Sequence, residues 1–156
     1  MHIKFIVVGK TSFPYLKEGI DLYLGRLKHY GKVEYTELHV KIPKSAKEKD
    51  VKELEAQAFL KHVNSSDTII LLDERGKKFH SIGFSKWLQK FMLNSTKSIV
   101  FLVGGPYGFS DELKSMSSQK ISLSEMTFSH QMIRVFFLEQ LYRAHTILKG
   151  EPYHHE

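Results

Sequence analysis

The chain has 156 residues, of which 42% are hydrophobic and 26% charged, with a formal net charge of +6 and no cysteine. This length and composition predict one folded domain over residues 1–156 and argue against intrinsic disorder. The missing cysteines exclude disulfides, a thiol nucleophile and a cysteine zinc site, while the basic balance permits a nucleic-acid partner without requiring one.

The first half of the chain alternates strand-like and helix-like segments. A short apolar run rich in β-branched residues predicts a strand over residues 3–8, and helically spaced apolar residues predict a helix over residues 15–30. Residues 33–40 favour a second strand, in which Glu37 competes with apolar neighbours for the inner face. After a loop, a charged helix is expected over residues 46–63, with its inward positions at Val51, Leu54, Ala58 and Phe59.

The second half continues this alternation with more apolar strands. Residues 68–72 and 98–103 are continuous apolar runs, which are typical of strands buried on both faces. Between them, residues 81–93 show the spacing of an amphipathic helix.

The remaining segments complete the pattern. Residues 110–117 predict a short helix with Ser110 as its N-cap, and residues 120–123 predict another strand. A long helix is expected over residues 129–148. Strands that alternate with helices indicate an α/β fold with a mainly parallel sheet flanked by helices.

The last predicted helix has almost no polar face. A helix that is apolar nearly all round is buried on all sides. Two interpretations stay open, a central core helix or a surface covered by a second copy in a homodimer. We favour the homodimer, because a domain of this size rarely covers such a helix alone.

The chain lacks the signals of export and of membrane insertion. Its opening apolar run is too short for a signal peptide, and no stretch approaches the roughly 20 apolar residues of a membrane helix. We expect a protein of the cytoplasm with no membrane partner.

Several familiar motifs are ruled out. Gly9-Lys10-Thr11 follows a strand, but a phosphate-binding loop needs a glycine where Lys4 stands. The nine histidines form no HExxH motif and no clear ligand spacing, so no metal is expected. No GxSxG sequence supports a serine hydrolase.

Three predicted strand ends carry the strongest signs of a binding site: residues 72–76, 104–108 and 123–128. The glycine-rich segment 104–108 does not match the dinucleotide-binding fingerprint. Two interpretations stay open for its glycines. They either only allow backbone dihedral angles that other residues avoid, or they also let a ligand approach the backbone closely. Since ligands of open α/β sheets bind beyond the carboxyl ends of strands, neighbouring strands would bring all three segments to one crevice.

Charged residues of the last helix are further candidates. His130 and Arg134 are four residues apart and so share a face, while Arg143 lies nine residues further on. Arginine in an apolar helix is costly unless it is paired. Two interpretations remain for the arginines: salt bridges with Glu139 or Glu125, or contacts with a phosphate or a substrate base.

Taken together, these segments resemble the ribosomal large-subunit pseudouridine N3-methyltransferases, a group of small SPOUT-class enzymes. The resemblance spans the whole chain and is most specific in four blocks: Leu72-Asp73-x-x-Gly76, FLVGGPYG at 101–108, LSEMTFSHQMIR at 123–134 and EQLYRA at 139–144. Many relatives have proline where Ser129 stands, and arginine where His155 stands. Serine can cap the helix instead, whereas His155 weakens the case for a terminal cation that grips RNA.

The resemblance implies an α/β trefoil knot, a homodimer and S-adenosylmethionine as cofactor. It also implies that the methyl acceptor is N3 of a pseudouridine in the intersubunit stem-loop of 23S rRNA, methylated on the assembled 70S ribosome. The implied cofactor contacts are Leu72, Gly104, Gly105, Leu123, Ser124, Glu125, Met126, Thr127 and Phe128.

The chemistry then requires help for N3 to lose its proton. Histidine is the usual group for that task, so we expect His154 or His130 to act as a base or hydrogen-bond partner. Arg143, and less directly Arg134, would stabilise the developing anion, with Tyr153 beside them in the tail. The sequence does not rank these residues.

Two rival functions share the implied fold. One is a SPOUT methyltransferase acting on tRNA or another rRNA base, and the other is a non-catalytic ribosome-binding factor. Mapping the modified nucleotide distinguishes the first rival from a pseudouridine N3-methyltransferase. Ribosome association without methyl transfer would indicate the second rival.

Overall fold

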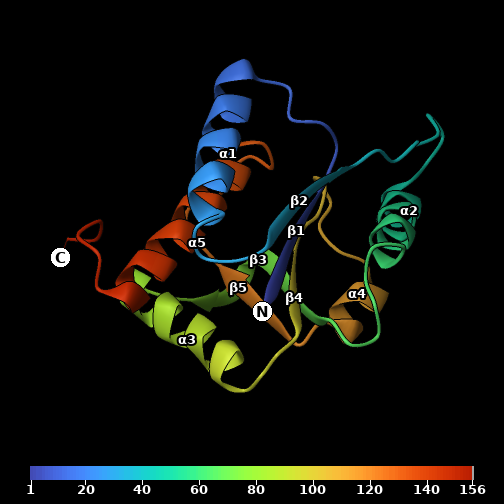
Figure 1. The fold of residues 1–156 in the computed structure, drawn as a ribbon. Helices are drawn as coiled ribbons and strands as arrows, with labels where there is room; N and C mark the ends of the chain where they lie inside the picture. The colour runs from blue at the N-terminus through green and yellow to red at the C-terminus, as the bar shows by residue number, and fades with distance from the viewer. Residues whose placement is uncertain (156) are drawn as a thin grey trace.

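The computed structural model describes residues 1–155, which form a five-stranded sheet with helices on both faces (Figure 1). The elements are β1 (His2–Val8), α1 (Pro14–Leu27), β2 (Val33–Leu38), α2 (Glu48–Leu60), β3 (Thr68–Lys78), α3 (Ser81–Leu93), β4 (Ser98–Val103), α4 (Asp111–Met116), β5 (Gln119–Ser122) and α5 (Met132–Lys149). Within residues 1–155, no helix combines the length and apolar character needed to cross a bilayer.

The strand order is β2-β1-β4-β3-β5, and every pairing is parallel. This confirms the α/β fold with a parallel sheet. Because β4, β3 and β5 are neighbours that run in one direction, the loops after β4 and β5 leave from one edge of the sheet, where the second part of β3 holds residues 72–76. That arrangement places the three candidate segments together.

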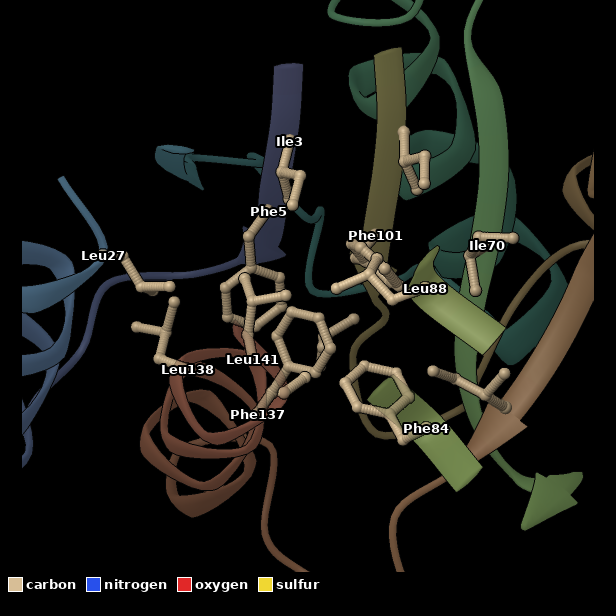
Figure 2. Packing of buried hydrophobic residues seen from close by; sticks show 14 of the residues in the cluster. Ile3, Phe5, Leu27, Ile70, Phe84, Leu88, Phe101, Phe137, Leu138 and Leu141 are labelled. Carbon is tan, nitrogen blue, oxygen red and sulfur yellow. The ribbon is translucent and has the colours of Figure 1, made fainter. Parts of the chain in front are cut away.

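The helices divide between the two faces of the sheet. Helices α1, α3 and α5 pack on one face, and α2 and α4 pack on the other, as the two core clusters show (Figure 1). Figure 2 shows Phe137 and Leu141 of α5 against the sheet residues Phe5 and Phe101. The ring of Phe137 lies 4.6 Å from that of Phe5 and 4.7 Å from that of Phe101, centroid to centroid.

Some predicted boundaries were wrong. Helix α2 is shorter than the predicted 46–63, and its buried side includes Glu55 and Ala56, while Leu54 and Ala58 are only half-buried. Helix α5 begins at Met132, after a turn at residues 130–131, and not at residue 129. Strand β3 continues to Lys78, beyond the apolar run that the prediction used, because its polar second part pairs with β5 after a register shift between Leu72 and Lys77.

That shift makes Gly76 an important residue for stability. A Cβ atom at Gly76 would lie 2.5 Å from the backbone N and C atoms of Ile121. We expect Gly76→Ala to lower the free energy of unfolding by about 3 kcal/mol, because overpacking against backbone cannot be relieved by a rotamer change. Denaturant unfolding measures it. Gly83→Ala is the control, since only Phe79 lies within 4 Å and helix propensity favours alanine; equal effects would contradict the prediction.

Helix α5 is a core helix on one side. Phe137, Leu138 and Leu141 are fully buried on the sheet, which confirms the first interpretation for that face. Its other side carries Phe136, which is 40% exposed and stacks on Phe128 with ring centroids 4.8 Å apart. The homodimer that would cover this side stays a prediction.

His145 of α5 gives the fold a pH dependence. Its side chain stacks on Tyr30 and is only 8% exposed; burial, aided by the charge of Lys149, lowers its pKa from 6.5 to about 4. The folded state therefore binds fewer protons than the unfolded state between those values, so stability is full above pH 6.5 and falls as the pH drops toward 4. We expect His145→Gln to remove up to about 3 kcal/mol of that pH dependence.

The measurement is urea unfolding of wild type and variant at several pH values between 4 and 7. His39→Gln is the control, because His39 is exposed. A pH dependence of the His145 variant that parallels wild type would contradict the assignment.

Candidate functional site

The second part of β3 and the loops after β4 and β5 line a pocket of about 670 Å³ at the carboxyl edge of the sheet. This confirms that the three segments 72–76, 104–108 and 123–128 meet in one crevice. Residues 72–76, expected to follow a strand, instead lie inside β3 at its register shift. His130, in the turn before α5, and Ile133, in the first turn of α5, also line the pocket, and Glu48 and Lys52 of α2 reach it from the other face.

The structure brings nearly all of the predicted cofactor contacts to this pocket. It is lined by Leu72, Gly104, Gly105, Leu123, Ser124, Met126, Thr127 and Phe128. Glu125 is not among the lining residues. Its carboxylate accepts a hydrogen bond of 2.6 Å from Lys78 Nζ, and this ion pair lowers the pKa of Glu125.

Short hydrogen bonds hold the loop between β5 and α5. The Ser122 hydroxyl donates to the carbonyl of Ser124 at 2.7 Å, and Ser124 Oγ accepts from the backbone N–H of Met126 at 2.9 Å. Thr127 Oγ1 donates to Glu74 at 3.2 Å, which joins this loop to the second part of β3. At the loop's end, Ser129 Oγ accepts from the backbone N–H of Met132 at 3.1 Å and so caps the turn that leads into α5, whose N-cap residue is Gln131 and not the expected Ser129.

The glycine turn, residues 104–108, is closed by its own backbone and by α2. Gly108 has a φ of +75° and donates its N–H to the carbonyl of Gly105 at 3.1 Å. The Gly105 N–H donates to Glu55 Oε2, also at 3.1 Å. Burial raises the pKa of Glu55, and the hydrogen bond from Gly105 opposes that rise only in part. Sequence reasoning missed Glu55, although its spacing from Val51 and Phe59 placed it on the inner face of the helix.

The pocket suits a ligand such as S-adenosylmethionine, which joins a nucleoside to an amino acid. Its volume lies in the usual range for sites of small molecules. The apolar side chains of Val103, Ile121, Leu123 and Ile133 provide surface for a base, and charged side chains at the rim provide polar partners. A Cβ atom at Gly104 would lie 3.3 Å from both the carbonyl oxygen of Gly108 and Phe109 Cε1, so glycine at this position lets the turn fold closely on itself.

Arg134 is fully buried behind the pocket and bound by the protein itself. Its guanidinium donates to the carbonyls of Val8 at 2.8 Å, Gly9 at 2.9 Å and His130 at 2.9 Å, and to Thr11 Oγ1 at 2.8 Å. Neither expectation for Arg134 was right: its partners are not Glu139 or Glu125, and it has no surface for a substrate. We therefore assign Arg134 to holding the end of β1 against the start of α5.

Glu37 of β2 supplies the counter-charge, with its Oε1 3.6 Å from Arg134 Nη1. Burial alone would raise the pKa of Glu37, but hydrogen bonds from Thr11 and Tyr35 and the charge of Arg134 bring its pKa below the usual value. The carboxylate is therefore ionised at neutral pH. The sequence offered Glu37 only as a possible inner-face residue and gave no sign of its partner.

The predicted residues of the tail form a second cluster. Arg143 Nε donates to Glu139 Oε1 at 3.0 Å, which confirms the salt bridge expected for this arginine. Tyr153 donates to the same oxygen at 3.1 Å, and its ring lies 4.7 Å from the Arg143 guanidinium carbon. His154 Nδ1 lies 3.3 Å from Arg143 Nη1. Glu156, at the end of the tail, lies outside the described residues.

The two clusters are separate within one chain. His130 lines the pocket, whereas Arg143, Tyr153 and His154 do not. Arg143 lies eleven residues after Met132, or about 17 Å along the helix axis. One copy of the chain therefore does not unite all of the predicted catalytic residues.

His130 is the titratable ring of the pocket rim. Burial, and then the positive charge of Arg134, lowers its pKa from 6.5. The ring is therefore neutral at neutral pH, with a nitrogen free to accept a proton. In residues 1–155, no group of three or more side chains is arranged to hold a metal ion.

Comparison with known proteins gives one consistent result. A family model described as "Predicted SPOUT methyltransferase" matches residues 1–154. Similar curated proteins include one from Christiangramia forsetii, 49% identical over 99% of both chains, and ones from Parabacteroides distasonis and Flavobacterium psychrophilum, each 50% identical over the full length of both chains. All three are named ribosomal RNA large subunit methyltransferase H.

Proposed function

The chain belongs to the SPOUT methyltransferase family, and from that premise we propose that it methylates N3 of a pseudouridine in 23S rRNA on the assembled 70S ribosome. The methyl donor in this proposal is S-adenosylmethionine. The observation that carries it is the pocket, in which three segments that carry the family's sequence blocks converge. The names of the relatives support large-subunit rRNA as the class of substrate.

The pocket residues would hold the donor. Its base would lie on the apolar side chains, and the backbone of the glycine turn and of Leu72 would meet its polar groups. When bound, S-adenosylmethionine supplies a methyl group already activated by a sulfonium, so the protein has to align and deprotonate the acceptor. Orientation of this kind is worth roughly 7–11 kcal/mol of a reaction barrier.

The tail cluster would reach the pocket from a second copy. Since Arg143, Tyr153 and His154 do not line their own pocket, a homodimer in which one chain's tail meets the other chain's pocket would complete the site. The exposed Phe136 and Phe128 offer apolar surface for such contact. The trefoil knot likewise stays a prediction from the family resemblance.

The hydrogen bonds suggest different roles for the two histidines. A guanidinium has only donors, so His154 Nδ1 accepts from Arg143 in this contact, which leaves Nε2 as the nitrogen that can donate. His154 would then donate a hydrogen bond to the acceptor base as negative charge develops, with the charge of Arg143 behind it and Tyr153 keeping that arginine in place. His130, neutral and facing the pocket, would take the N3 proton.

Recognition of the ribosome would rest on the surface of the dimer. The net charge of +6 per chain suits contacts of lysine and arginine with phosphates, which position a protein on RNA. The proposal places the protein in the cytoplasm, where ribosomes are found.

Methyl transfer from labelled S-adenosylmethionine tests this function. The substrates are 70S ribosomes, separated subunits and naked rRNA, all from cells that lack the gene. Label that enters 70S ribosomes and not naked rRNA supports the proposal. Label in tRNA or free rRNA would overturn the substrate, and ribosome binding without label would indicate a non-catalytic factor.

A further inference from the structure

Glu55 is an acidic residue buried in the middle of the molecule. Its side chain lies on the face of α2 that packs against the sheet, beside Ala56 and Phe59, and it is 5% exposed. A carboxyl group in such a place is costly unless it is hydrogen-bonded. Among the described residues, the hydrogen bond found for this carboxyl comes from the Gly105 N–H, at 3.1 Å.

Gly105 is fitted to that carboxyl. A Cβ atom built on Gly105 would have as its three nearest neighbours Oε1, Cδ and Oε2 of Glu55; Oε1 would be closer than real Cβ contacts allow, and Cδ and Oε2 would be tighter than most. A side chain at position 105 would therefore displace the Glu55 carboxyl from its present place. One and two turns earlier on the same side of α2, Lys52 and Glu48 line the pocket.

We propose that Glu55 is a positioning residue, which acts through Gly105 to fix the glycine turn in the form that accepts the cofactor. The inference rests on the proposed function, because it assigns the glycine turn to cofactor binding. Glu55 itself does not line the pocket. Its hydrogen bond fixes the direction of the peptide before Gly105 and so presents the neighbouring backbone of Gly104 to the pocket.

The test is calorimetric binding of S-adenosylhomocysteine to the purified full chain. Loss of the hydrogen bond between Glu55 and Gly105 predicts roughly tenfold weaker binding for Glu55→Ala. Glu55→Gln keeps an acceptor of the same shape, so we expect it to recover binding to within about threefold of wild type. Glu53→Ala is the matched control, because Glu53 lies on the exposed side of the same helix.

A double-variant cycle separates positioning from general stability. Gly105→Ala should weaken binding in the wild-type background and add little in the Glu55→Ala background, because the side chain that it would clash with is gone. Faster hydrogen exchange of the Gly105 amide in Glu55→Ala, but not in Glu55→Gln, would report the lost tether directly.

The outcomes are distinct. If wild type binds and Glu55→Ala binds equally well, the positioning role is wrong. If Glu55→Gln loses binding as fully as Glu55→Ala, the hydrogen bond is not the cause and the inference also fails. If wild type itself does not bind S-adenosylhomocysteine, the proposed function fails first, and the inference falls with it.

Discussion

Replacing Arg134 with methionine is expected to lower the free energy of unfolding by about 3–5 kcal/mol. Methionine would fill much of the space, but Glu37 would lose its counter-charge. The carbonyls of Val8, Gly9 and His130 would lose their donor inside the protein. Glu37 is itself exposed to solvent, so most of the cost comes from the buried side of the arginine, where several acceptors would be left without a donor.

Chemical denaturation measures this effect, and two further variants make the result specific. Arg134→Lys keeps the charge but not the fork of donors, so it should recover only part of the loss. Arg75→Ala removes an exposed arginine and should change stability by no more than about 0.5 kcal/mol. A loss for Arg134→Met as small as that for Arg75→Ala would contradict the role assigned to Arg134.

Replacing His130 with asparagine is expected to lower kcat for methyl transfer by about 10²–10⁴-fold, the usual contribution of a general base. Because the base must be neutral, activity of wild type should fall as the pH drops through a pKa below 6.5. This fall at low pH is the acid limb of the pH profile. The variant should be slow at every pH and should not show the acid limb. The measurement is the pH dependence of methyl transfer to 70S ribosomes for both proteins.

His154→Asn is the matched comparison. Loss of a hydrogen-bond donor to a developing anion typically costs about 10²–10³-fold, so this variant should also be slow. Its acid limb should remain, however, since His154 is assigned the role of donor. An acid limb that disappears in His154→Asn and persists in His130→Asn would reverse the two roles.

The architecture was largely predictable from the sequence. The runs at residues 68–72 and 98–103 are apolar because both faces of their strands are covered, and the three candidate segments met at the carboxyl edge of the sheet, although residues 72–76 proved to be part of β3. These are local patterns joined by a general rule of topology. The second part of β3 was missed because it is polar and pairs at the edge of the sheet, where no apolar run marks it.

The partners of buried charges were not predictable. Arg134 binds Glu37 and the loop after β1, and Glu55 binds Gly105, in each case across a long stretch of sequence. Periodicity shows which face a residue occupies but does not show what lies opposite. Arg143 was easier because Glu139 is one helical turn away.

The predicted cofactor contacts and the predicted catalytic residues also differ in how far the sequence places them. The pocket residues lie at one edge of the sheet, so the fold of a single chain brings them together. The tail cluster lies at the other end of α5, and its relation to the pocket depends on a second copy of the chain. The residues of the binding pocket can therefore be identified from one chain, whereas the full set of catalytic residues cannot.

The most direct test of the account is to identify the methylated nucleoside by mass spectrometry. 70S ribosomes from cells without the gene are incubated with the protein and S-adenosylmethionine, and the 23S rRNA is digested and mapped. The account predicts one new nucleoside, a pseudouridine that carries a single methyl group on N3, within one stem-loop at the subunit interface. A methyl group on another base, or on no nucleotide of 23S rRNA, would contradict it.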